Sequence, residues 1–164
     1  MRELDRNKKT IYYALFESEE EEMRNGLYTG GKTKLYGPVV KTKMGTSGAR
    51  TAYGFVSSVT QMEFFGIDKP YSKTMWTSDI NCPITEETIV WLDQGTLAEY
   101  DSEKSYTAGA KCIHEGKIYK CAEDTAAGEF DPSVWNAVIH THIVTGISKS
   151  LNFIVYALKE VDFR

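Results

Sequence analysis

The chain has 164 residues and a formal net charge of −4, and 41% of its residues are hydrophobic. This is enough for one domain with a packed core, or for a domain plus a small module. The 19 basic residues are dispersed among 23 acidic ones, so the sequence lacks the basic patch of sequence-independent DNA binding. No apolar run is long enough to cross a bilayer. No signal segment follows the charged N-terminus, which predicts synthesis and assembly in a cytoplasm.

The first half of the chain alternates between strand-like and loop-like segments. Residues 11–16 form an apolar and aromatic run that is typical of a buried strand. The acidic and glycine-rich residues 17–33 predict a solvated loop, and residues 34–41 predict the strand that returns from it. Residues 45–49, Gly-Thr-Ser-Gly-Ala, indicate a second loop.

The second half continues in the same way, and no long stretch shows convincing helical periodicity. Residues 64–68 and 71–77 are strand-like pieces, and residues 88–93 restore the pattern after a break. Residues 143–147 and 153–158 predict a hairpin. Short strands at this regular spacing predict an all-β fold, either a small β-barrel or a sandwich.

Residues 98–140 have the pattern of a small module inserted into a different β-protein. Two short strands flank the tight turn Glu115-Gly116, and aromatic side chains surround a miniature core. The segments on either side share one β pattern, which the module interrupts. The sequence therefore predicts a discontinuous barrel domain, residues 1–97 and 141–164, with an inserted three-stranded β-module at residues 98–140.

Three cysteines, Cys82, Cys112 and Cys121, fit a reducing compartment. A hairpin centred on the Glu-Gly turn would place Cys112 opposite Tyr119 and diagonal to Cys121. This geometry disfavours a disulfide, so we expect buried thiols.

His140 and His142 alternate, so on a strand they would face the same side. Together with Cys112 and Cys121 they could form a zinc set. The cysteine spacing differs from the close pairs of zinc ribbons, and the alternative is that the two histidines lie where the module rejoins the barrel. We predict no metal ion and no cofactor.

One motif imitates a nucleotide-binding loop. Residues 26–33 fit the phosphate-loop pattern, and residues 89–93 imitate the apolar strand that ends in a magnesium-binding aspartate. That mechanism needs a helix directly after Lys32, and Pro38 would break such a helix. We interpret the segment as a glycine-rich hairpin connection. Because no other catalytic pattern is present, we predict that the chain is not an enzyme.

The predicted barrel segments contain a series of short phrases in a fixed order. They are NKKTIYYAL (residues 7–15), FGID with YSK (65–68 and 71–73), CPI with IVW (82–84 and 89–91), IVTGI with SLN (143–147 and 150–152), and YALKEV (156–161). In this order they resemble the head-tail joining, or head-closure, proteins of long-tailed bacteriophages. No single phrase has a chemical role, so the resemblance depends on their order.

The resemblance implies a virion structural protein of the neck, made and assembled in the host cytoplasm. Copies would form a ring of six or twelve that joins the DNA-filled head to the tail and helps to retain packaged DNA. The implied partners are portal or adaptor proteins above and the tail terminator or tail tube below. DNA would pass through without sequence-specific binding, and no membrane is involved. The loops expected at residues 17–33 and 43–52 would reach neighbours or the channel.

The module has a different resemblance. Its scaffold residues Tyr100, Tyr106, Gly109, Gly116, Tyr119 and Trp135 are similar to those of small chitin-binding-type carbohydrate modules. Those modules have adjacent exposed aromatic residues after the second strand, whereas this chain has Cys-Ala-Glu-Asp-Thr at residues 121–125. The resemblance makes Tyr100, Tyr106, Tyr119 and Trp135 the candidate glycan contacts. The alternative function is therefore a glycan-binding virion decoration or adhesion module that acts through residues 98–140.

Overall fold

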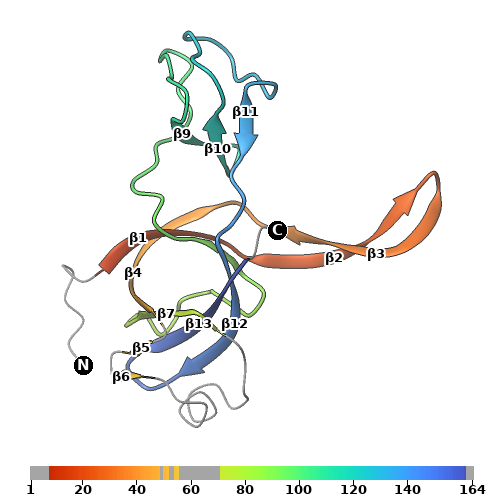
Figure 1. Ribbon diagram of the computed structural model, residues 1–164. Coiled ribbons are helices and arrows are strands. Elements are labelled where there is room, and N and C mark those ends of the chain that lie inside the picture. Colours follow the sequence, from red (N-terminus) through yellow and green to blue (C-terminus); the bar gives the residue numbers. More distant parts are fainter. Residues whose placement is uncertain (1–7, 49, 52–53, 56–70, 162–164) are drawn as a thin grey trace.

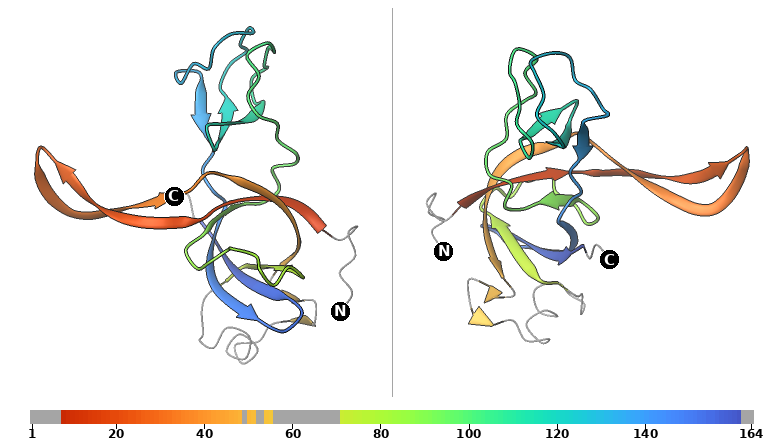
Figure 2. Two further views of the ribbon diagram at one scale, coloured as in Figure 1. Left: turned by 180° about the vertical axis from the view of Figure 1, so that it is seen from behind. Right: turned by 45° about the horizontal axis from the view of Figure 1, so that its top comes forward.

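The computed structural model describes residues 8–48, 50–51, 54–55 and 71–161, and every regular element in this part of the chain is a strand. Six strands close into a barrel, two form a long projecting hairpin, and three form a small separate sheet (Figures 1 and 2). The prediction of an all-β fold with a barrel is therefore confirmed. The strand expected at residues 64–68 lies outside the described residues.

The barrel consists of antiparallel neighbours throughout. In spatial order the strands are β1 (Lys8–Ala14), β4 (Val40–Gly48), β7 (Lys73–Thr77), β13 (Ile154–Glu160), β12 (His142–Lys149) and β8 (Ile89–Trp91). β8 then pairs with β1, which closes the barrel and leaves it without an open edge. The hairpin predicted from residues 143–158 is confirmed as β12 and β13. A short strand pair, β5 (Arg50–Thr51) and β6 (Gly54–Phe55), lies outside the barrel sheet.

Strand alternation separates the barrel interior from its outer surface. Ile11 and Tyr13 of β1 belong to the interior cluster, whereas Tyr12 between them belongs to a second cluster outside the barrel. The buried interior cluster consists of Ile11, Tyr13, Met44, Met75, Ile84, Val90, Leu92, Val144, Ile154, Tyr156 and Leu158. Each of these residues comes from the segments predicted to form the barrel.

A bulge adjusts this alternation in β12. Val144 and Ile147 both contact the interior cluster although they are three residues apart. The register of β12 against β13 shifts between Val144 and Gly146, and the extra residue inverts the alternation beyond it. The bulge therefore keeps both halves of the strand packed on the same core.

The module contains β9 (Lys111–His114), β10 (Lys117–Cys121) and β11 (Trp135–Ala137), with β10 in the centre. This confirms the predicted three-stranded sheet. Glu115 and Gly116 have φ values of 47° and 73°, as a two-residue hairpin turn requires. Cys112 lies opposite Tyr119 as expected.

The base of the module is buried against the outside of the barrel. The shared cluster contains Tyr12, Ala14, Ile89 and Trp91 of the barrel and Ile113 and Ile118 of the module. Trp91 Nε1 donates a hydrogen bond to the Val138 carbonyl over 2.8 Å. The Val39 amide donates to the Gly116 carbonyl over 2.8 Å. The module is thus a separate sheet, but it covers one apolar face of the barrel.

The acidic segment after β1 is a hairpin, and the loop predicted for residues 17–33 is wrong. β2 (Phe16–Arg24) pairs with β3 (Leu27–Tyr36). Asn25 and Gly26 form the turn with φ values of 53° and 78°, and an Asn-Gly pair is the preferred sequence for such a turn.

The loop predicted for residues 45–49 is also wrong over residues 45–48. These residues continue β4 and pair with β7. Gly45 reflects close packing, because it lies directly opposite Trp76.

Candidate functional site: the projecting hairpin and its surroundings

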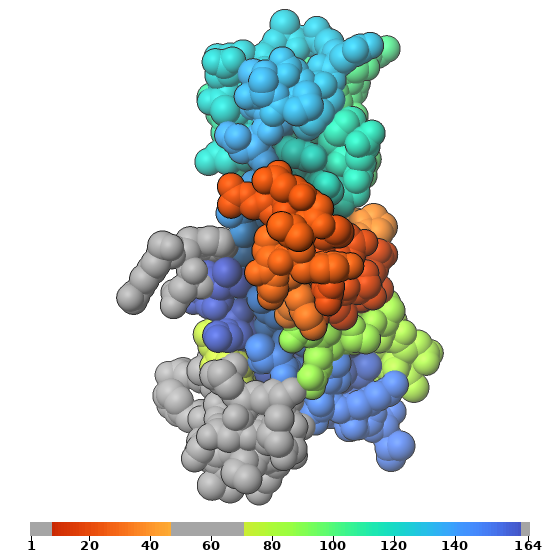
Figure 3. Space-filling model, turned by 90° about the vertical axis from the view of Figure 1, so that its right-hand side faces the viewer, coloured from red at the N-terminus to blue at the C-terminus, as the bar shows by residue number. Residues whose placement is uncertain are grey.

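The hairpin of β2 and β3, here called the arm, extends away from the barrel. Figure 3, with the arm toward the viewer, shows it standing out between the module and the rest of the barrel. Every residue from position 17 to position 30 is exposed. A lone two-stranded hairpin is marginally stable in water, and its unpaired outer edges are templates for pairing. The arm therefore exposes strand edges and side chains that the rest of the described chain leaves uncovered.

The two faces of the arm differ in charge. On one face Glu19 is the register partner of Lys34 and Glu21 is that of Lys32, and Lys32 Nζ lies 3.5 Å from Glu19. This face is electrically balanced.

On the other face Glu20 lies opposite Thr33. The Thr33 hydroxyl donates a hydrogen bond to Glu22 over 2.9 Å, so Glu22 extends over the same face. Neither carboxylate has an ion pair with any residue in the described part of the chain. This face of the arm therefore has two carboxylates without ion pairs, and Arg24, which alternates with them along β2, lies beyond them next to the turn.

The tip of the arm is apolar. Met23 is 59% exposed, Leu27 74% and Tyr28 69%, and Met23 lies opposite Tyr28 across the turn. Grouped exposed apolar side chains mark interaction surfaces. Sequence reasoning missed this tip because it treated the segment as a loop, although the Asn25-Gly26 pair was a signal for a hairpin.

The base of the arm is fixed to the barrel. Lys34 forms an ion pair with Glu87 and donates a hydrogen bond to its carboxylate. This hydrogen bond raises the pKa of Lys34. The Gly37 amide donates to the Leu15 carbonyl over 2.9 Å. A groove of about 320 Å³ lies between the arm base, the barrel and the module, and its walls include Tyr36, Val39, Trp91, Gly116 and Val138.

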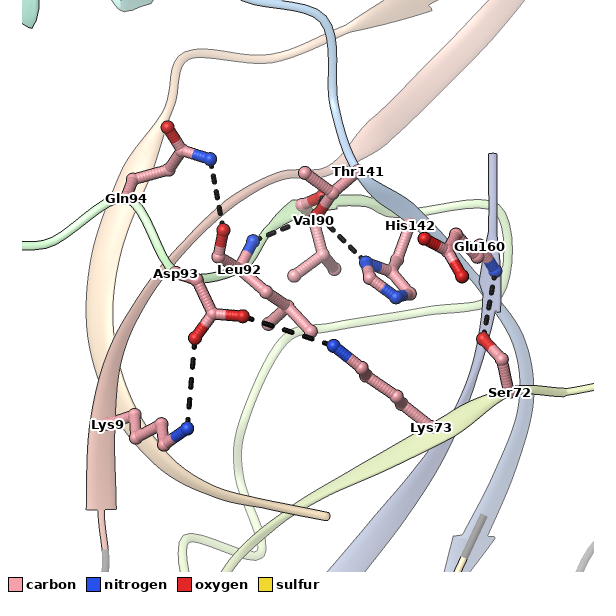
Figure 4. A network of polar contacts seen from close by, with 10 residues as sticks. All are labelled: Lys9, Ser72, Lys73, Val90, Leu92, Asp93, Gln94, Thr141, His142 and Glu160. Carbon is pink, nitrogen blue, oxygen red and sulfur yellow. Dashed lines mark hydrogen bonds and ion pairs between the residues drawn. The ribbon is translucent and has the colours of Figure 1, made fainter. Parts of the chain in front are cut away.

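A network of polar contacts links several strands of the barrel (Figure 4). Asp93 has a φ of 57° and follows β8, and its two oxygens lie 3.7 Å from Lys9 Nζ and 3.9 Å from Lys73 Nζ. Thr141 accepts a hydrogen bond from the Leu92 amide over 3.0 Å and donates to the Val90 carbonyl over 3.2 Å. These contacts connect β1, β7 and β8 with the start of β12.

His140 and His142 lie in different surroundings, so the expectation that they share one side is wrong. β12 begins at His142, and His140 precedes it with its ring 6.2 Å from that of Trp91 outside the barrel. His142 is buried, and its Nδ1 lies 2.8 Å from the Thr141 hydroxyl. Burial lowers the pKa of both imidazoles, and Lys73 lowers that of His142 further.

The cysteines are buried or half-buried thiols. Burial raises the pKa of Cys112 to about 11, and Cys121 Sγ donates to the Glu123 carbonyl over 2.8 Å. A thiol with a raised pKa is a poor nucleophile and a poor metal ligand. Among the described residues, no three His, Cys, Asp or Glu side chains form a group that could hold a metal ion.

The four candidate glycan contacts lie together in the core of the module. Trp135 is only 3% exposed. Its ring meets those of Tyr100 and Tyr106 edge-on, with centroids 5.7 and 5.1 Å away. Tyr119 packs against Phe130 at 4.9 Å. Trp135 has no free ring face for a sugar, whereas the three tyrosines are half-buried and their role as glycan contacts stays a prediction.

The nucleotide-loop motif occupies the tip and the outer strand of the arm. Residues 26–33 form the turn and most of β3. β3 continues through Tyr36, where a phosphate loop would need a helix. The interpretation of residues 26–33 as a connection is wrong, because only Gly26 belongs to the turn and residues 27–33 form a strand.

Comparisons with protein-family models, with curated proteins and with solved structures find no match to this chain. The described residues include no helix that is long and apolar enough to span a bilayer.

Proposed function

We propose that this chain is a structural protein of a bacteriophage neck. In this proposal copies of the barrel form a ring of six or twelve that joins the DNA-filled head to the tail and helps to retain packaged DNA. Portal or adaptor proteins lie above the ring, and the tail terminator or tail tube lies below it. The proposal rests on the order of the short sequence phrases in the barrel segments, which resembles that of head-closure proteins.

The observation that supports an assembly role is the exposed arm. Its side chains contact little of their own chain, and its apolar tip is open to solvent. Burying such a tip between copies is favourable by roughly 25 cal/mol for each Å² of apolar surface. Heterologous contacts of this kind close into rings when the rotation between copies allows it.

The charge of the chain suits a passage for DNA. A ring around a moving duplex should not hold its phosphates tightly, because phosphate contacts by lysine and arginine dominate non-specific affinity. The chain has a formal net charge of −4, and one face of its arm has two carboxylates without ion pairs, Glu20 and Glu22. A mildly acidic ring would let DNA pass without gripping it.

The test is to locate the protein in intact particles. An epitope tag added after Arg164 can be labelled and imaged by electron microscopy. We expect label only at the single vertex where head and tail meet, with ring-shaped density there. Label distributed over the capsid shell or along tail fibres would overturn the proposal.

The glycan-binding alternative makes a different prediction. Particles or purified protein would bind chitin-type oligosaccharides, and Tyr100→Ala would abolish that binding. The packing of Trp135 into the module core offers this alternative no support, so we favour the connector.

A further inference from the structure

We propose that the acidic face of the arm docks on the outer surface of strand β4 in a neighbouring copy of this chain. The inference builds on the proposed ring and assigns the surfaces that make its repeating contact. It follows from three features: an arm without a partner, its carboxylates without ion pairs, and two exposed lysines on the outer face of β4.

The lysine row lies on β4. Lys41 is the register partner of Tyr12, and Lys43 is that of Thr10. Tyr12 belongs to the cluster outside the barrel, whereas Met44 on the alternate face of β4 belongs to the interior. Lys41 and Lys43 therefore point outward, and both are exposed. Neither forms an ion pair with another described residue.

The two surfaces match in spacing and in sign. Glu20 and Glu22 are two residues apart on one face of the arm, and Lys41 and Lys43 are two residues apart on one face of β4. Side chains at this spacing on a strand are roughly 6.5 Å apart. An arm laid along β4 can therefore present each carboxylate to one ammonium group.

The two surfaces belong to different elements of the molecule. The arm leaves one side of the barrel, and β4 starts beside the base of the arm and curves around the barrel to the other side (Figures 1 and 2). A contact between two different surfaces is heterologous, so it can repeat from copy to copy and close into a ring. The apolar tip would then be buried on the neighbour.

A charge swap tests this contact. The arm variant has Glu20→Lys and Glu22→Lys, and the strand variant has Lys41→Glu and Lys43→Glu. Each variant alone places like charges at the contact, so we expect self-association of the full chain, measured by sedimentation, to weaken about tenfold or more. An equimolar mixture of the two variants restores opposite charges at every contact and should restore association.

The balanced face of the arm provides the matched control. Glu19→Gln with Glu21→Gln changes the charge of the same strand on its other face and should leave association unchanged. Leu27→Ser at the exposed tip should weaken association without lowering the melting temperature. Carbodiimide cross-linking of the unmodified protein should join Glu20 or Glu22 to Lys41 or Lys43 between copies.

The outcomes separate this inference from the proposed function. A chain that stays monomeric at millimolar concentration overturns the docking contact, as does a mixture that fails to restore association. Neither result contradicts the proposed location in the neck, because that location is measured separately by imaging particles. Conversely, if association depends on these charges but the protein lies elsewhere in the particle, the docking contact is supported and the proposed connector function is overturned.

Discussion

Gly45 shows how a single missing side chain shapes the barrel. It lies opposite Trp76 on the neighbouring strand, and a Cβ at this position would overlap the indole ring. The glycine is needed for space, since its φ is not in the left-handed region. The aromatic ring in turn covers the backbone that the glycine leaves bare.

We predict that Gly45→Ala destabilises the fold. The Trp76 ring must shift, and overpacking of this kind costs roughly 1–3 kcal/mol. Gly128→Ala is the control, because a Cβ there meets nothing within 4 Å and its φ is also ordinary. Urea unfolding followed by tryptophan fluorescence measures both variants, and equal midpoints for the two would contradict the role assigned to Trp76.

The two histidines predict a loss of stability at mildly acidic pH. Burial lowers the pKa of His140 and His142 in the folded state. Around His142, Lys73 adds to the effect, whereas Glu160 and Asp93 oppose it. The unfolded chain therefore takes up protons first as the pH falls. The stabilisation is complete above the unfolded pKa of about 6.5 and is lost as the pH falls through that value toward the folded pKa.

Thermal melts between about pH 8 and pH 5 measure this effect. We expect the melting temperature to fall with pH in this window, and to fall less steeply in His142→Gln. Asp101 and Asp131 have lowered pKa values through hydrogen bonds with the Glu103 backbone and with Ser133. These two carboxyl groups affect stability only near and below the usual aspartate pKa of about 4. Their contribution is therefore separate from that of the histidines. A flat profile above pH 5 would refute the role of the histidines.

Among the elements, those with buried apolar runs could be predicted and those with exposed surfaces could not. Residues 11–14 and 154–158 form strands as predicted, because hydrophobic burial determines both their pattern and their structure. The first strand ends at Ala14, before the predicted boundary at residue 16. β2 is rich in glutamate and lacks a buried face, so no hydrophobic alternation indicated it. Its fold depends on pairing with β3 through the Asn25-Gly26 turn, which is a signal of turn chemistry and not of burial.

The candidate surfaces were harder to predict for the same reason. The sequence correctly predicted that the aromatic residues of the module pack together. It could not distinguish a tryptophan buried in the core from one exposed for stacking on a sugar ring. The side toward which Lys41 and Lys43 point depends on the register of β4 with β1. That register is a property of the closed barrel and cannot be read from a short segment containing glycine and proline.

The hairpin turn between β9 and β10 also fixes the module to the barrel. Gly116 has a φ of 73°, and a Cβ there would come within 2.8 Å of Pro38 Cβ. Gly109 has a φ of 89° but has open space around it. Both glycines carry the same conformational penalty for substitution, and only one adds a steric conflict with the barrel.

We therefore predict that Gly116→Ala is more destabilising than Gly109→Ala. The left-handed conformation costs roughly 1 kcal/mol in each, and the contact with Pro38 adds about 1–3 kcal/mol in the first. Differential scanning calorimetry of the two variants measures the difference. If Gly109→Ala lowered the melting temperature as much, the turn would not be a docking contact.

At the scale of the whole molecule, the barrel and the module differ in what they need from each other. The interior cluster of the barrel draws all its members from outside residues 98–140. The outer cluster does not, since Ile113 and Ile118 cover Ile89 and Trp91. The barrel is therefore expected to close without the module, but with an apolar face exposed.

This division predicts the result of excising residues 98–140 and joining Leu97 to Thr141. The shortened barrel should fold, because Thr141 retains its hydrogen bonds to Val90 and Leu92 beside the junction. It should be less stable, by roughly 1.5–3 kcal/mol for each large side chain that loses its cover. Exposed Ile89 and Trp91 should also make it prone to aggregate.

Polar substitutions separate the two effects. In the shortened chain, Ile89→Thr with Trp91→Thr removes the exposed apolar face while keeping residues that favour strands, and we expect it to restore solubility and a cooperative melt. In the full chain the same substitutions should be destabilising, because they remove side chains buried under the module and the hydrogen bond from Trp91 to Val138. A shortened chain that stays unfolded even with both substitutions would show that the module belongs to the folding core of the barrel, and the boundary at residues 98 and 140 would be wrong.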